Sequence, residues 1–182
     1  MTESPKIAKV LLLAGLDNSG KTSIAYSLRG TRNLPTFCKT KPTVRRNILS
    51  IKAYDSEYII WDLGGQEAYR DEYLENFDNY FKGLDKFIYV FDVQDIKRYD
   101  LALEYYEKII NLLKDRNNAT NIEVSIFLHK YDPDLNNIRP DITDKIIDDL
   151  KDQIKKIIDK TEFFYQIFKT SIYCLFDKTV TD

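Results

Sequence analysis

The residues best suited to chemistry form one short segment, residues 15–22, with the sequence GLDNSGKT. It follows the apolar run of residues 7–14 and precedes a helical pattern that begins near Lys21. The spacing GxxxxGK[ST] between a strand and a helix is typical of a loop that wraps around phosphate groups. Its glycines let successive backbone N–H groups converge on phosphate oxygens, and the helix N-terminus adds the positive end of its dipole.

Two side chains of this segment have the chemistry to handle a nucleoside triphosphate. Lys21 can bridge the β- and γ-phosphates, and the Thr22 hydroxyl can bind Mg²⁺. The motif by itself identifies neither the base nor the reaction. We expect nucleotide contacts here from Gly15, Asp17, Asn18, Ser19, Gly20, Lys21, Thr22 and Ser23.

A second chemical cluster, Trp61 to Glu67 (WDLGGQE), lies at the end of another strand pattern. At a strand end the Asp62 carboxylate can reach Mg²⁺, usually through a water molecule. Gly64 or Gly65 can bring its backbone N–H against the terminal phosphate, where a larger residue would obstruct it. The Gln66 amide can orient a water molecule for attack. The two clusters together predict a site that binds a nucleoside triphosphate and hydrolyses it.

GLDNSGKT and WDLGGQE resemble the corresponding motifs of the Ras-superfamily GTPases, and of the Arf branch in particular. The resemblance implies an α/β fold of the P-loop NTPase class, a Ras-like G domain with about six mainly parallel strands flanked by helices. It also implies GTP and GDP as ligands, Mg²⁺ as cofactor, and two switch segments that respond to the nucleotide. In this scheme Gly65 meets the terminal phosphate and Gln66 orients the attacking water.

The family also has a threonine in its first switch that binds Mg²⁺ only when the terminal phosphate is present. The match here is Thr43, and the competitors in the same segment are Thr31, Thr36 and Thr40. The resemblance therefore implies a metal-binding set of Thr22, Thr43 and Asp62. It implies a catalytic set of Lys21, Thr43 and Gln66.

Residues 129–132 (HKYD) match the family's base-recognition pattern Asn-Lys-x-Asp except at the first position. Asp132 matches the carboxylate that accepts from N1 and N2 of guanine, and the opposite donor pattern of adenine would leave that carboxylate unpaired. Lys130 matches the lysine whose stem lies on the base. His129 replaces an asparagine that ties this loop to the phosphate loop, and a neutral histidine can still donate and accept.

The His-Lys-x-Asp variant resembles the Rag GTPases, as do FIYVFDV at residues 87–93 and TSIY at residues 170–173. The second of these matches the loop whose backbone N–H meets guanine O6, with Ser171 or Ile172 as the donor. The chain is thus Arf-like in its phosphate loop and second switch and Rag-like in its base-recognition loops. Both families continue with a long helix, which we expect to be short or absent beyond residue 173.

Apolar patterning predicts the elements that position these motifs. We expect an antiparallel hairpin of residues 44–54 and 58–63, and a loop over residues 30–43. Further strands are expected at 7–14, 87–93, 122–128 and within 163–172. Helices are expected at 21–28, 101–113 and 141–160.

The length of 182 residues suits one G domain over residues 1–182 with a core of 7–173. The 27 basic and 29 acidic residues are interspersed, which gives no electrostatic case for binding nucleic acid. Cys38 and Cys174 lack the spacing of a disulfide framework or metal site. Without an apolar span or a lipidation motif, we expect a cytoplasmic protein, free or held at a membrane periphery through a partner.

The expected partners are an effector, an exchange factor and an activating protein, and homo- or heterodimerisation stays open. The main alternative is a poorly hydrolysing GTP-binding scaffold subunit of a Rag-like dimer, which retention of Gln66 and Thr43 argues against. A P-loop kinase that uses ATP is a further alternative, and Asp132 argues against it.

Overall fold

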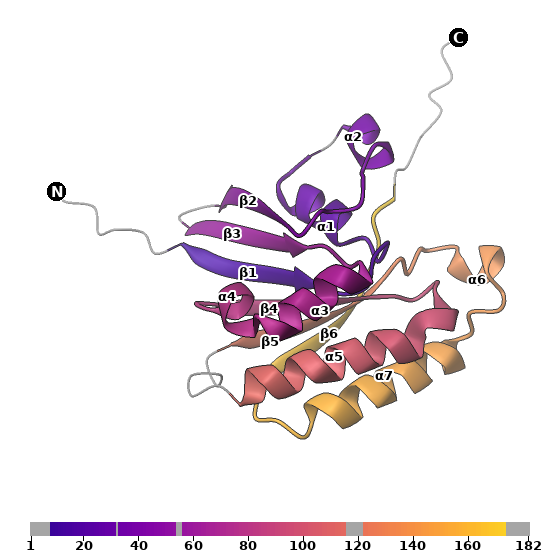
Figure 1. Ribbon diagram of the computed structural model, residues 1–182. Coiled ribbons are helices and arrows are strands. Elements are labelled where there is room, and N and C mark those ends of the chain that lie inside the picture. Colours follow the sequence, from indigo (N-terminus) through magenta and orange to yellow (C-terminus); the bar gives the residue numbers. More distant parts are fainter. Residues whose placement is uncertain (1–7, 32, 54–55, 116–121, 174–182) are drawn as a thin grey trace, which may run out of the picture.

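The computed structural model describes residues 8–31, 33–53, 56–115 and 122–173 (Figure 1). Its six strands form one sheet in the order β2-β3-β1-β4-β5-β6. Neighbouring strands are parallel except β2 and β3, which are antiparallel, so the expected mainly parallel sheet is confirmed. The strands are β1 (Lys9–Ala14), β2 (Arg46–Ala53), β3 (Ser56–Leu63), β4 (Lys86–Asp92), β5 (Glu123–His129) and β6 (Tyr165–Thr170).

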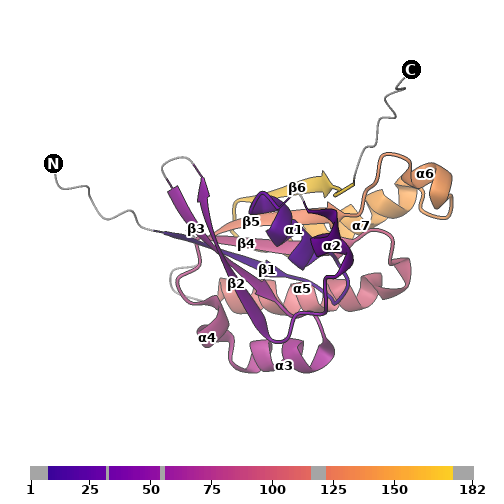
Figure 2. The same cartoon turned by 90° about the horizontal axis from the view of Figure 1, so that it is seen from above.

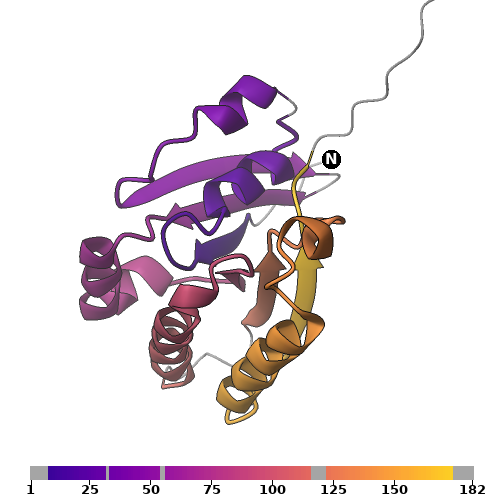
Figure 3. The same cartoon turned by 90° about the vertical axis from the view of Figure 1, so that its right-hand side faces the viewer.

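Helices cover both faces of the sheet. On one face α1 (Lys21–Leu28) packs Ile24 and Ala25 against Leu13, Ile60 and Val90. The other face carries the larger core, where α5 and α7 run side by side (Figure 3). Seen from above, α1 lies in front of the twisted strands (Figure 2). The helices of the second face are α3 (Glu67–Glu75), α4 (Phe77–Phe81), α5 (Tyr99–Lys114) and α7 (Asp144–Ile158).

Three short helices complete the fold: α2 (Leu34–Cys38), the 3₁₀ helix η1 (Ile96–Arg98) and α6 (Leu135–Ile138). The expectation of a loop throughout residues 30–43 is wrong, because α2 lies within it. Pro35 lies in the first turn of α2, where a missing N–H costs no helical hydrogen bond. No helix of the described residues is long and apolar enough to cross a membrane.

Several element boundaries differ from the expected ones by one to three residues, and two of these differences have clear local reasons. β2 begins at Arg46 rather than Val44, because Arg45 has φ 55 and this left-handed backbone ends the extended chain. α7 begins at Asp144 rather than 141, because the Thr143 hydroxyl accepts from the Ile146 N–H and caps the helix. The expected short or absent final helix lies in residues 174–182, outside the described residues.

The parallel strands direct their carboxyl ends to one edge of the sheet, where ligands of such sheets bind. The segments that follow β1, β3, β4 and β5 all begin at this edge. The motifs of the phosphate loop, the second switch and the base loop therefore meet there.

Candidate nucleotide site

The phosphate loop connects β1 to α1 and depends on two glycines. Gly15 has φ 143 and Gly20 has φ 91, both in the left-handed region. A Cβ on Gly15 would lie 2.4 Å from the Val90 carbonyl oxygen, and one on Gly20 would lie 2.5 Å from His129 Cδ2. The phosphate loop thus packs between Val90 of β4 and His129, the first residue of the base loop (residues 129–132).

Lys21 is a buried cation at the centre of this loop. Its Nζ donates to the carbonyl oxygens of Leu16 at 2.6 Å and Gly15 at 3.1 Å. Burial lowers the pKa of Lys21 to about 8, although the nearby carboxylates of Asp62 and Asp17 oppose the shift. A cation held by neutral oxygens has capacity to bind an anion, and a phosphate is the anion that this loop geometry suits.

Three oxygen atoms from three separate segments meet beside Lys21. Thr22 Oγ1 lies 2.7 Å from Asp62 Oδ2 and 2.9 Å from Thr43 Oγ1, and Thr43 Oγ1 lies 3.1 Å from the same Asp62 oxygen. Asp62 is fully buried, and burial raises its pKa. Its other oxygen, Oδ1, is buried with no hydrogen-bond partner among the described residues. A bound cation would stabilise the ionised form of this carboxylate.

The chemistry of these oxygens fits Mg²⁺. This ion prefers oxygen ligands, and it usually takes one or two carboxylates together with substrate phosphates and water. The described part of the chain contains no group of three His, Cys, Asp or Glu side chains that could hold a metal alone. Thr22, Thr43 and Asp62 offer two hydroxyl oxygens and one carboxylate, a set that suits a metal shared with a polyphosphate.

The geometry also separates Thr43 from its competitors in the first switch. Thr43 is hydrogen bonded to both Thr22 and Asp62. The Thr40 hydroxyl instead donates to the Thr36 carbonyl oxygen at 3.2 Å. Of the threonines that the sequence left open, Thr43 is the one placed with the other two oxygens.

The second switch lies directly against the phosphate loop. The Gly64 N–H donates to the Arg45 carbonyl oxygen, and the Asp17 N–H donates to the Gly65 carbonyl oxygen at 3.0 Å. A Cβ on Gly65 would lie 2.1 Å from the Asp17 nitrogen, so only glycine permits this approach. Because the N–H of Gly64 is engaged, Gly65 is the better placed of the two glycines to meet a phosphate.

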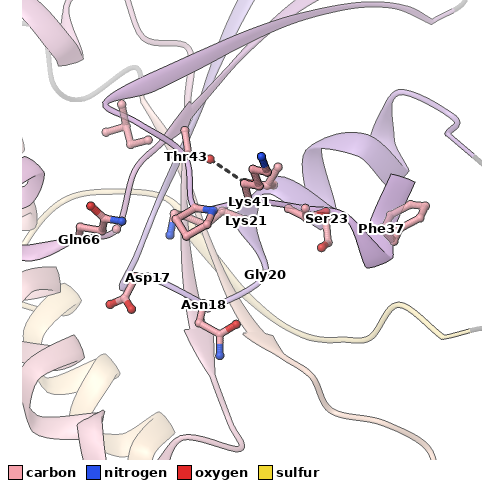
Figure 4. A pocket seen from close by; sticks show the side chains of 14 residues that line it. Asp17, Asn18, Gly20, Lys21, Ser23, Phe37, Lys41, Thr43 and Gln66 are labelled. Atoms are coloured by element: carbon pink, nitrogen blue, oxygen red, sulfur yellow. Dashed lines mark hydrogen bonds between the residues drawn. The ribbon is translucent and has the colours of Figure 1, made fainter. Parts of the chain in front are cut away.

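These segments enclose a cavity of about 350 Å³ (Figure 4). Gln66, at the start of α3, and Asp17 lie on one side of it, whereas Ser23 and Phe37 lie on the other. The lining contains the residues expected to act in catalysis, Lys21, Thr43 and Gln66, and most of the expected phosphate-loop residues, but not Gly15 or the buried Ser19. Its residues are Asp17, Asn18, Gly20, Lys21, Thr22, Ser23, Phe37, Thr40, Lys41, Pro42, Thr43, Leu63, Gly65 and Gln66.

The base loop brings Asp132 and Ser171 together from segments 39 residues apart. The Ser171 hydroxyl donates to Asp132 Oδ1, and Gln94 Nε2 donates to Oδ2 at 2.9 Å. Lys130 Nζ forms an ion pair with Asp92 Oδ2 at 2.6 Å. Ile172 packs against the core on the α1 face. The Asp132 carboxylate is therefore fixed on both sides by its own chain.

His129 occupies the junction between the base loop and the phosphate loop. It is 3% exposed, its ring lies against Gly20, and its Nδ1 lies 3.0 Å from Thr170 Oγ1. Burial lowers the pKa of His129 to about 4, so the ring is neutral at pH 7. His129 thus connects the base loop to the phosphate loop by packing against Gly20, and it keeps one hydrogen bond to Thr170 at the end of β6.

Residues 9–181 match the family described as the Gtr1/RagA G protein conserved region. The chain belongs to the Gtr1/RagA G-protein family. The match spans nearly the whole chain and agrees with the Rag-like features of the base-recognition loops.

This Gtr1/RagA-family protein is also similar to Arf proteins. It is 32% identical to ADP-ribosylation factor 3 of Arabidopsis thaliana over 127 residues, which are 70% of this chain and 63% of that protein. It is 31% identical to ADP-ribosylation factor F of Dictyostelium discoideum over 130 residues, 71% of this chain and 63% of that protein. The matched region thus spans less than two thirds of each relative.

A solved structure confirms the fold of this Gtr1/RagA-family protein. The Arl6 BBS3 small GTPase from Trypanosoma brucei, solved with the bound nucleotide analogue GppNp, superposes with a TM-score of 0.67 at 17% identity. The superposition covers 91% of this chain and 87% of that one. The expected Arf-like small GTPase of the Ras superfamily, with Rag-like features, is confirmed.

Three residues at the site of this Gtr1/RagA-family protein were not predicted from its sequence. Asp92 pairs with Lys130, Gln94 holds Asp132, and Arg98 contacts Asp17 of the phosphate loop. Asp92 could have been found by the argument used for Asp62, because it is a carboxylate at the carboxyl end of a buried parallel strand. Gln94 and Arg98 carry no comparable signal in the sequence.

Proposed function

We propose that this protein is a guanine-nucleotide switch that binds GTP with Mg²⁺ and hydrolyses it to GDP and phosphate. The observation that carries the proposal is the cluster of Thr22, Thr43 and Asp62 oxygens beside the buried Lys21 ammonium. A hydroxyl cluster with one carboxylate supports binding of a metal together with a polyphosphate. The membership in a G-protein family supports the same ligand.

Guanine specificity is assigned to the base loop. Asp132 has the carboxylate to accept from N1–H and N2–H of guanine, and adenine would leave it without donors. Gln94 and Ser171 hold that carboxylate in place, so it need not reorganise when the base binds. The Ser171 or Ile172 backbone N–H is the proposed donor to guanine O6.

Hydrolysis is assigned to residues that line the cavity between the phosphate loop and the two switches. Gln66 orients the attacking water, while Lys21 and the N–H groups of the phosphate loop hold the phosphates and balance the charge that develops on them. Mg²⁺, when bound, would neutralise charge on the phosphate oxygens. We expect slow intrinsic turnover, about 10⁻⁴–10⁻² s⁻¹, as in GTPases without an activating partner.

The switch itself is assigned to Thr43 and Gly65. Thr43 precedes β2 and Gly65 follows β3. When the terminal phosphate is present, Thr43 would gain a contact with Mg²⁺ and Gly65 a contact with that phosphate. Loss of that phosphate would release both segments together. Effectors, an exchange factor and an activating protein are the partners that such a change would serve.

The Gln66→Leu substitution tests the enzymatic part of the proposal. Leucine keeps the size of the side chain but removes the amide, so we expect GTP affinity to change by less than about twofold and single-turnover hydrolysis to fall by at least about tenfold. The control is Glu67→Gln, the exposed neighbour in α3, which should hydrolyse GTP like the wild type. Equal rates in all three proteins would refute the role of Gln66. Tight GTP binding by a wild type that does not hydrolyse would favour the scaffold alternative.

A further inference from the structure

Arg98 of η1 reaches across to the phosphate loop, 81 residues earlier in the chain. Its Nη1 lies 2.8 Å from Asp17 Oδ1, and its Nη2 donates to the Asp17 carbonyl oxygen at 3.2 Å. Its Nε donates to Asp95 Oδ2 at 2.5 Å. The Arg98 guanidinium therefore binds both the side chain and the backbone of Asp17, and its hydrogen bond to Asp95 fixes its position. A planar guanidinium suits such multiple contacts.

Asp17 needs this partner because of where it lies. It lines the cavity beside Gln66, and its backbone N–H is bonded to the Gly65 carbonyl oxygen. A carboxylate at that place repels a bound polyphosphate. The carboxylate of Asp17 is about half exposed, with 46% of its side chain accessible, so water screens its charge only in part.

We propose that Arg98 is a positioning residue of the phosphate loop. Arg98 keeps the Asp17 carboxylate against its own guanidinium and balances the negative charge of that carboxylate, so the loop accepts the terminal phosphate of GTP. The inference rests on the proposed function of the site. Arg98 acts through Asp17 and is not assigned a contact with the nucleotide.

The position of Asp17 also determines which phosphate is affected. Its neighbour across the loop is Gly65, the glycine proposed to meet the terminal phosphate. An unbalanced Asp17 carboxylate therefore opposes the terminal phosphate more than the inner ones. Arg98 favours GTP relative to GDP, and its loss shifts the preference toward GDP.

The test is a double-mutant cycle on GTP and GDP affinity, measured with Mg²⁺ present. Arg98→Gln removes the charge, and we expect about five- to tenfold weaker GTP binding with less than about twofold change for GDP, since the pair is partly exposed. Asp17→Asn in the same protein removes the repelling carboxylate and restores GTP affinity. Asp17→Asn alone removes a negative charge beside the terminal phosphate, so we expect it to bind GTP more tightly than the wild type. The matched control is Lys97→Gln, which removes the same charge from the exposed neighbouring residue.

Each other outcome overturns the inference or the function on which it rests. If Arg98 only supports η1, Arg98→Gln weakens GTP and GDP equally and Asp17→Asn gives no rescue. An effect of Lys97→Gln equal to that of Arg98→Gln would assign the change to general electrostatics, which also refutes the specific pair. Wild-type protein that fails to bind GTP refutes the proposed function, whereas wild-type binding with an unaltered Arg98→Gln variant refutes only this inference.

Discussion

His129 offers a prediction whose size follows from its burial. It is the only histidine of the chain, it is 3% exposed, and burial lowers its pKa to about 4 from the ordinary 6.5. Below pH 6.5 the unfolded chain therefore binds a proton that the folded chain does not. Stability that is present above pH 6.5 is lost progressively as the pH falls toward 4. At about pH 5.5, one unit below the unfolded pKa, the loss is about 1.4 kcal/mol.

The His129→Asn variant isolates this effect. Asparagine cannot titrate but still donates and accepts hydrogen bonds, so the loop junction keeps a polar group. Denaturant unfolding of both proteins, in one nucleotide state, is compared at about pH 8 and about pH 5.5. The acidic side chains titrate in both proteins and cancel in the comparison. We expect the wild type to lose about 1.4 kcal/mol more than the variant between these pH values.

An equal loss in the two proteins would rule out a lowered pKa for His129 in the folded chain. It would mean that His129 takes up its proton as readily in the folded chain as in the unfolded one. Water would then reach the His129 ring between Gly20 and Thr170, and the contact between the base loop and the phosphate loop would be solvated.

Three further substitutions test separate parts of the site. Gly65→Ala places a Cβ 2.1 Å from the Asp17 nitrogen, so the second switch must move away from the phosphate loop. We expect GTP affinity to fall by about tenfold and GDP affinity to change less. Titration with fluorescent nucleotides measures both affinities. Asp132→Asn removes the carboxylate that accepts from the guanine N–H groups, and the new amide can donate to the C2 oxygen of xanthine. We expect GTP affinity to fall by about 100-fold and XTP affinity to rise. A retained preference for GTP would refute the role of Asp132 in guanine recognition. Gln94→Leu removes the donor to Asp132 Oδ2; GTP affinity should fall about threefold with an unchanged dependence on Mg²⁺, and a lost Mg²⁺ dependence would show that the residue acts elsewhere.

The phosphate loop and the sheet could be predicted from the sequence because their signals are local. The spacing of residues 15–22 and the apolar run before it lie within one short stretch. The meeting of Thr22, Thr43 and Asp62 could also be anticipated, because the resemblance to a family with known switches assigned them one ligand. Their shared contacts agree with that assignment.

What could not be predicted depends on tertiary distance or on opposing local signals. Arg98 is one of several arginines, and nothing in the sequence indicates that it meets Asp17. Gln94 is polar and follows a strand, as many loop residues do. The prolines of residues 30–43 favoured a loop, but Pro35 is compatible with the first turn of α2. For Arg98 and Gln94 the decisive contact lies far away in the sequence, outside the window that a sequence pattern covers.

Binding of a guanine nucleotide with Mg²⁺ is the property on which the proposed switch depends. The most direct measurement is the affinity of the wild-type protein for GTP, GDP and ATP, each with Mg²⁺ and with chelator. We predict binding of GTP and GDP, GTP binding at least about tenfold tighter with Mg²⁺, and ATP binding at least about 1,000-fold weaker than GTP. ATP bound as tightly as GTP would rule out guanine specificity at this site, and GTP affinity that does not respond to Mg²⁺ would rule out the metal.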